Sequence, residues 1–238
     1  MLPSKLITSL SFFAIYTATA PLQSHGATVT FDNVQPSSDI ILANSQKSST
    51  GAIQVYNLSG TGDRWVGFGF QTTSSALLDK VTFTIYNDLV YSGALGSTLT
   101  LSIVSIPTLT SAPSAPLVIL YSESATVPLT YSQQDYFTFD LTTPYQLAAN
   151  SPYGILLAFS NPAAQNKAIT LWQASVNTAG TNNLGSTFYT MDGGASYTTS
   201  SGTLNFVLQT VPEPSALLLS LSAFGLLCFL WRRQALQA

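Results

Sequence analysis

Apolar residues recur at every second position through most of this chain, and this alternation constrains the fold more than any other feature. The clearest runs are residues 81–85, 99–103, 137–141 and 204–208. A period of two is that of a β-strand with one face in the core and the other in water. Residues 153–159 are apolar throughout, as expected for a central strand covered on both faces.

This pattern predicts an all-β fold for residues 27–210, an antiparallel β-sandwich of jelly-roll type with about ten strands. At 238 residues the chain has room for this domain and two short terminal segments. The proline-rich residues 107–116 are predicted to form a long loop that crosses between the two sheets.

Glycines in two places have a more specific meaning. Gly67 and Gly69 alternate with the apolar residues of 66–70, which predicts a strand that another part of the backbone approaches closely. The Asp-Gly-Gly sequence at residues 192–194 is typical of a tight hairpin turn, because glycine readily adopts positive φ.

Charged residues make up only 7% of the chain, so hydroxyl and amide side chains must provide most of its polar surface. The net charge is -3, and no cluster of Lys or Arg could neutralise a run of phosphates. We therefore expect no nucleic-acid partner. The single cysteine, Cys228, lies in an apolar terminal segment, so the body has no disulfide and no thiol nucleophile.

Residues 1–26 have the features of a secretory signal peptide. Lys5 precedes an apolar stretch, and small residues follow it. We expect a signal helix that directs export and is removed, with a cut after Ala20 or near Gly26. An uncleaved anchor is the alternative, although the apolar stretch is shorter than the roughly 20 residues that cross a bilayer.

Residues 216–233 are predicted to form a transmembrane helix. Its apolar part would be about 24 Å long, slightly less than a hydrocarbon core of about 30 Å. Trp231 suits the membrane interface, and Arg232 with Arg233 would hold that end in the cytoplasm. Residues 234–238 are then a short cytoplasmic tail, which places the body outside the inner membrane.

The sequence Val-Pro-Glu-Pro-Ser at residues 211–215 precedes this helix and is expected to be extended, because proline cannot join a helix interior. This motif, the apolar span and the Arg pair together resemble the PEP-CTERM sorting signal of Gram-negative bacteria that make extracellular polysaccharide. The resemblance implies that an exosortase recognises Pro212, Glu213 and Pro214, removes the tail and leaves the body at the cell surface or in the extracellular matrix. An ordinary C-terminal anchor is the alternative.

The body also resembles the choice-of-anchor domains that accompany such tails, most nearly type R. The residues that carry this resemblance are 78–83 at the start of a long strand, the proline-rich loop, residues 153–157 and the late Asp-Gly-Gly hairpin.

The sequence does not predict an enzyme. The only histidine, His25, lies beside the signal cleavage region, and a Gly-x-Ser-x-Gly motif is absent, so a His-dependent hydrolase lacks its residues. A surface glycan hydrolase that uses two carboxylates is an alternative, with Glu123, Asp135 and Asp140 as candidates.

No cofactor and no metal site are predicted. A zinc site would need His or Cys ligands, which the body lacks. The single carboxylate of Asp192 fits a hairpin better than a calcium cage, which needs several converging oxygens. Asp32 and Asp39 leave a structural ion open as an alternative.

Tyrosines near strand ends and turns are interpreted as rim packing, with a weak carbohydrate-binding face as the alternative. Trp65 and Trp172 are flanked by apolar strand residues and are expected in the core. The tyrosines concerned are Tyr56, Tyr86, Tyr91, Tyr121, Tyr131, Tyr136, Tyr189 and Tyr197.

These features together predict a non-catalytic exported protein with a structural or adhesive role in exopolysaccharide or biofilm. Its expected partners are an exosortase, the inner membrane and exopolysaccharide. The first alternative is a lectin-like module, whose ligand the sequence does not identify, and the second is the glycan hydrolase.

Overall fold

The computed structural model describes residues 26–45, 51–58, 62–114, 116–160, 166–174, 183–200 and 202–211. The predictions of a signal peptide, a sorting motif and a transmembrane helix rest on residues 1–25 and 212–238, which lie outside this set. Within the described ranges, no helix is both long enough and apolar enough to span a bilayer.

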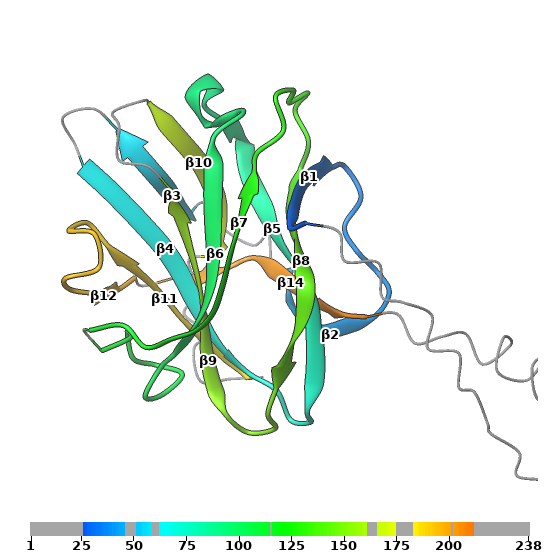
Figure 1. Cartoon of the computed structure of the whole chain (residues 1–238), viewed down its shortest axis with the longest axis vertical. Coiled ribbons are helices and arrows are strands. Elements are labelled where there is room, and N and C mark those ends of the chain that lie inside the picture. The colour runs from blue at the N-terminus through cyan, green and yellow to red at the C-terminus, as the bar shows by residue number, and fades with distance from the viewer. Residues whose placement is uncertain are drawn as a thin grey trace, which may run out of the picture.

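Strands make up nearly all of the described regular structure (Figure 1), and one short 3-10 helix, η1 (Ser92–Ala94), is present. The strands are β1 (Thr28–Asp32), β2 (Ile40–Asn44), β3 (Gly51–Leu58), β4 (Gly62–Gln71), β5 (Ala76–Val90), β6 (Thr98–Ser105), β7 (Ile119–Thr126), β8 (Tyr136–Leu147), β9 (Pro152–Phe159), β10 (Lys167–Ala174), β11 (Leu184–Thr190), β12 (Thr198–Thr199), β13 (Thr203–Leu204) and β14 (Phe206–Thr210).

All of these strands pair in antiparallel fashion, which confirms the all-β, antiparallel part of the prediction but not the jelly-roll sandwich. In place of two separate sheets, they form one 14-stranded sheet with the main path β1-β8-β5-β10-β3-β4-β9-β6-β7. The long strand β5 explains this continuity, because it pairs with β14 through residues 78–83 and with β10 at Ile85 and Val90. The sheet curls into a nearly closed, barrel-like form (Figure 1).

Side chains join β7 to β8 and bring the barrel close to closure. The carboxylate of Glu123 on β7 accepts a hydrogen bond from the backbone N–H of Thr142 on β8 at 2.8 Å. The hydroxyl of Tyr121 donates to the carbonyl oxygen of Thr143 at 2.9 Å. β1 pairs with β8 only at residues 136–140. Tyr121 and Glu123 of β7 therefore bond to the part of β8 that lies beyond the end of β1.

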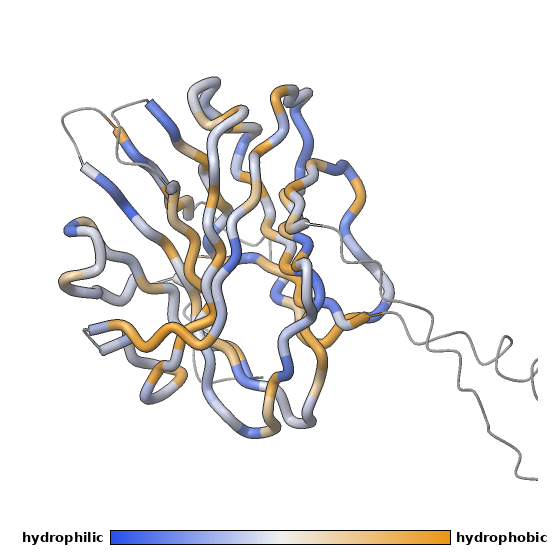
Figure 2. The backbone as a smooth tube through the Cα atoms, viewed as in Figure 1, coloured by the Kyte–Doolittle hydropathy of each residue, from blue (hydrophilic) through white to orange (hydrophobic). Residues whose placement is uncertain are grey.

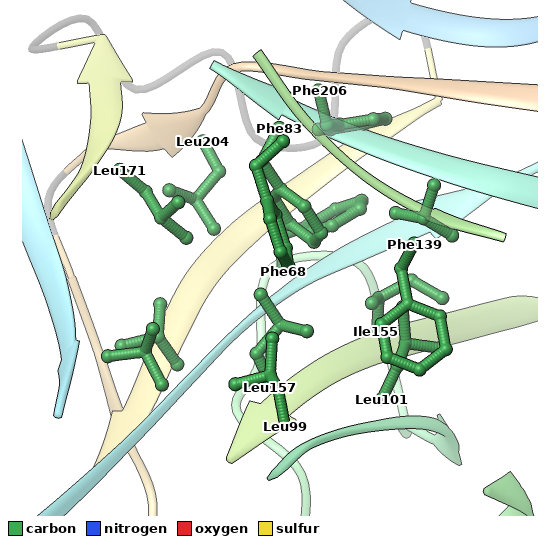
Figure 3. Close-up of a cluster of buried hydrophobic side chains, with 14 of the residues drawn as sticks. Phe68, Phe83, Leu99, Leu101, Phe139, Ile155, Leu157, Leu171, Leu204 and Phe206 are labelled. Atoms are coloured by element: carbon green, nitrogen blue, oxygen red, sulfur yellow. The ribbon is translucent and has the colours of Figure 1, made fainter. Parts of the chain in front are cut away.

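The core is filled by the inward-facing residues of the strands in which alternation was predicted. Val81, Phe83 and Ile85 are each at most 3% exposed, as predicted. Phe68 stacks on Phe206 with ring centroids 3.9 Å apart, and meets Phe83 edge-on (Figure 3). Figure 2 shows the same alternation as apolar and polar segments that follow one another along the strands.

The proline-rich loop differs from the prediction, because it does not cross between sheets. It joins β6 to β7, which pair directly with each other. The loop folds back toward β11, where the backbone N–H of Ser186 donates to the carbonyl oxygen of Leu109 at 2.8 Å. A loop can return to a neighbouring strand as readily as it can cross, and its composition alone does not distinguish the two.

The Asp-Gly-Gly hairpin is confirmed, but residues 191–197 form its loop, which is longer than the predicted tight turn. It joins β11 to β12, and Gly193 and Gly194 have φ values of 68° and 94°. The Asp192 carboxylate accepts hydrogen bonds from the hydroxyls of Thr190 and Ser196, both at 2.5 Å. These bonds, first those of Ser196 and then that of Thr190, lower the pKa of Asp192 below its usual range.

Candidate functional site

A groove of about 410 Å³ lies on the outer face of the barrel, across β4, β9, β6 and β7. These strands are direct neighbours in the sheet, and Figure 1 shows them side by side. The groove is lined by Asp63, Trp65, Thr100, Ser102, Leu117, Ile119, Ser122, Leu156, Ala158, Phe159 and Ser160.

Hydroxyl groups form much of the floor of this groove. Thr100 and Ser102 point outward because the alternate residues of β6 fill the core. The hydroxyl of Thr100 is hydrogen-bonded to those of Ser124, at 2.8 Å, and Ser160. The hydroxyls of Ser102 and Ser122 are 2.9 Å apart. Each hydroxyl can donate or accept, so this row can rotate to meet the hydroxyls of a ligand.

An aromatic ring forms one wall of the groove. Trp65 on β4 is half-buried and lines the groove, so its predicted place in the core is wrong. The reason is parity: Val66 is turned inward and 1% exposed, so its neighbour Trp65 faces outward.

Trp172 is also half-buried and not in the core. It lies between the buried residues Leu171 and Gln173 and packs against Tyr86 with ring centroids 4.9 Å apart. It is not one of the groove residues, so the described residues include one half-buried tryptophan inside the groove and one outside it.

A small second core holds the wall in place. Val104, Ile106, Leu156 and Phe188 form this core on the outer face, and Trp65 and Leu117 pack against it. The proline-rich loop brings Ile106 and Leu117 to this position.

Glycines allow the loop to lie close to the sheet. A Cβ atom at Gly69 would lie only 2.9 Å from Cδ1 of Ile106 and 3.3 Å from the carbonyl oxygen of Leu109. Only glycine leaves room for such an approach without a shift of the loop. This confirms the close backbone approach that the glycine pattern predicted.

Asp63 is the one ionisable residue among those that line the groove. The cations of the described chain lie elsewhere. Lys80 pairs with Asp140 at 2.7 Å, and Lys167 is only 4% exposed. The guanidinium of Arg64 lies over the rings of Tyr56 and Tyr189, 4.9 Å and 5.3 Å from their centroids.

Two of the three carboxylates proposed for a glycan hydrolase, those of Glu123 and Asp140, have other partners. Glu123 accepts from the backbone of β8, and Asp140 pairs with Lys80. The backbone carbonyl of Asp135 accepts from the N–H of Ile85 at 2.8 Å. None of the three lines the groove. The structure therefore does not bring them to the groove as a pair.

Asp32 and Asp39 are the acids considered for a structural ion, and the structure gives the Asp32 carboxylate a local partner. The carboxylate of Asp32 accepts from the backbone N–H of Val34 at 3.0 Å, and Asp39 has a positive φ of 56°. Across the described ranges, no group of three or more His, Cys, Asp or Glu side chains could hold a metal ion.

The tyrosines considered for a sugar-binding face are scattered, and none lines the groove. Tyr56 and Tyr189 flank Arg64, and Tyr131 packs on Phe31 with ring centroids 4.9 Å apart.

Tyr121 packs near Tyr145 at the join between β7 and β8, with ring centroids 5.6 Å apart.

The hydroxyl residues of the groove were not identified from the sequence. They look like the outer face of any strand, and only the register of β6 with β7 and β9 brings them together.

A second hollow, of about 620 Å³, lies near the end of the described chain. It is lined by residues 72–77, Ile40, Ile41, Gln146, Thr210 and Val211 and has no aromatic or ionisable side chain among them. Without such groups it offers less to a specific ligand than the groove.

Comparison with known proteins identifies the C-terminal segment. Residues 210–234 match the PEP-CTERM protein-sorting motif. No curated protein matches the chain. The match contains Pro212, Glu213 and Pro214, whose individual roles stay predictions. The motif implies a protein that is exported, sorted to the cell surface and processed by an exosortase.

Proposed function

We propose that this protein is a non-catalytic adhesive module that an exosortase releases to the cell surface or matrix, where its outer groove binds polysaccharide. The body is assigned in this proposal to the choice-of-anchor domains of type R, and its setting to an exopolysaccharide matrix or biofilm. The observation that carries the proposal is the combination of one aromatic wall, Trp65, with a floor of rotatable hydroxyls.

This combination fits the surface of a sugar ring. The C–H groups on one face of a pyranose are apolar and can pack on an indole, while the ring hydroxyls need donors and acceptors at its edge. The hydroxyls of Thr100 and Ser102 already bond to neighbouring hydroxyls, so a ligand would exchange one hydroxyl partner for another. Such an exchange leaves no buried polar group without a partner.

The non-catalytic part of the proposal rests on the carboxylates. Glycoside hydrolysis commonly requires two carboxyl groups that flank the scissile bond, at about 5 to 9.5 Å from each other. Asp63 is the single carboxylate among the groove residues, and Glu123 and Asp140 bond to other strands.

The test is binding of matrix polysaccharides by the full chain in detergent, measured by calorimetry and followed by an assay for new reducing ends. We expect heat of binding and no release of reducing ends. Trp65→Ala should abolish binding, whereas Trp172→Ala, at a half-buried tryptophan outside the groove, should retain it. Release of reducing ends would support the hydrolase, and a lack of binding to any polysaccharide would leave a purely structural module.

A further inference from the structure

We infer that the groove selects uncharged hexose chains and rejects polysaccharides rich in uronate. This inference rests on the proposed function, because it names the chemical class of the ligand for the same groove. Three features of the groove support it: its charge, the positions of the nearby cations and the apolar residues along its two sides.

The charge of the groove disfavours an anionic ligand. Asp63 is its single ionisable group, and a carboxylate repels the carboxylates of a uronate chain. Anion recognition in proteins normally uses Arg or Lys, often in a bidentate geometry, and the groove lining contains neither. A uronate chain would thus lose hydration without gaining an ion pair.

The cations of the described chain are not placed to compensate. Arg64 follows Asp63 on β4, but its guanidinium is held over the rings of Tyr56 and Tyr189, on a side chain that does not line the groove. Lys80 is paired with Asp140, and Lys167 is buried. An anionic polymer in the groove would meet none of these side chains within its lining.

Apolar residues on the side opposite Trp65 favour a chain with apolar faces. Leu117 and Ile119 line the groove there, and the exposed run continues through Val118 and Leu120. Ile119 is 55% exposed, and Val118 is 58% exposed. Figure 2 shows this run as a hydrophobic stretch that leads into β7.

Such an apolar run on an exposed strand is unusual unless a partner covers it. A hexose chain that lies between Trp65 and Ile119 would place C–H faces against both sides and hydroxyls on the floor. The same chain would cover part of the exposed run.

The experiment compares two panels of hexasaccharides with the full chain in detergent at low salt. The neutral panel holds gluco- and manno-oligosaccharides of several linkages, and the anionic panel holds galacturonate and mannuronate oligomers. We expect at least one neutral ligand to bind on the order of tenfold more tightly than any uronate. Its Kd should not change with salt, because no ion pair is formed.

Two variants make the result specific to the groove. Asp63→Lys should improve uronate binding on the order of tenfold at low salt, and salt should reverse this gain. Trp65→Phe keeps a ring in the wall and should retain neutral binding, whereas Trp65→Ala should lose it. Thermal unfolding of each variant separates loss of the site from loss of the fold.

The outcomes distinguish failure of the inferred selectivity for neutral chains from failure of polysaccharide binding itself. Trp65-dependent binding of uronates that equals or exceeds binding of neutral chains would overturn this inference and leave polysaccharide binding supported. Absence of binding to both panels would overturn polysaccharide binding and the inference with it.

Discussion

The carboxylate of Glu123 on β7 accepts a hydrogen bond from the backbone N–H of Thr142 on β8, with 2.8 Å between the oxygen and the nitrogen. Glu123 is directly opposite Leu101, which is fully buried. The side chain of Glu123 therefore leaves the backbone on the inner face of the sheet. An inward-pointing charge on an edge strand discourages pairing with another chain. Here it also satisfies a backbone donor of the neighbouring strand.

Loss of this bond should destabilise the barrel. We expect Glu123→Ala to lower the free energy of unfolding by about 1–3 kcal/mol, because a half-buried N–H of β8 loses its charged acceptor. Glu123→Gln keeps an acceptor oxygen and should cost less. Urea unfolding of the full chain measures both, with Thr126→Ala at an exposed position of the same strand as the control. Equal stabilities of Glu123→Ala and the control would contradict this role.

The neighbouring Tyr121 predicts a loss of stability at alkaline pH. Burial, and then the nearby Glu123 carboxylate, raise the pKa of Tyr121 above its ordinary value of 10.0. The folded state therefore holds a proton that the unfolded state releases first. This contribution to stability is complete below about pH 10 and is lost as the pH rises toward the folded-state pKa.

Tyr121→Phe should remove this contribution. Between about pH 9 and 11, the free energy of unfolding should fall less steeply for the variant than for the natural protein. Urea unfolding at a series of pH values gives both slopes, and the same slope for the two proteins would refute the assignment.

Substitution of Gly67 should cause a severe packing defect. A Cβ atom there would lie 2.3 Å from the carbonyl oxygen of Ile155 and 2.5 Å from Cε2 of Phe188. Since the first of these is backbone, Gly67→Ala should cost about 3 kcal/mol or more, or prevent folding. Gly193→Ala is the control, because its Cβ meets nothing within 4 Å and only the positive φ opposes it, at about 1–2 kcal/mol. A milder effect at Gly67 than at Gly193 would contradict the packing.

The ion pair between Lys80 and Asp140 should matter little for stability or binding. Its atoms are 2.7 Å apart, but the side chains are 36% and 18% exposed, so solvent screens the attraction. Asp140→Asn should change the free energy of unfolding by less than about 1 kcal/mol. It should also leave polysaccharide binding unchanged, since Asp140 does not line the groove. Loss of a hydrolytic activity in this variant would instead revive the carboxylate enzyme.

The sorting motif predicts a change in the mature protein. Deletion of Pro212, Glu213 and Pro214 should leave the hydrophobic tail attached, because the processing enzyme loses the segment it recognises. Mass spectrometry of the exported protein measures this directly, and cells that lack the exosortase provide the control. Removal of the tail from the deletion variant would count against recognition at these residues.

Much of the fold could be predicted from the sequence because alternation is a local property. Residues such as Val81 and Phe83 are buried by the parity of their own strand, whatever the strand pairs with. Glycine is also informative, because the missing side chain at Gly69 indicates that another segment packs closely against the backbone there. The same parity, applied to the buried Val66, places Trp65 on the outer face, whereas the apolar flanks of Trp65 by themselves favour burial.

The sequence by itself determined the class of the fold, the close approach at the glycines, the late hairpin and the sorting motif, since each depends on residues that are near in the chain. The tertiary structure alone decided that β5 joins its partners into one sheet, that Glu123 bonds to β8, and that the hydroxyls of β6 and β7 share a groove with Trp65. The physical reason is that strand pairing joins residues far apart in sequence. Many registers preserve the same alternation, and the packing of the whole barrel selects one of them.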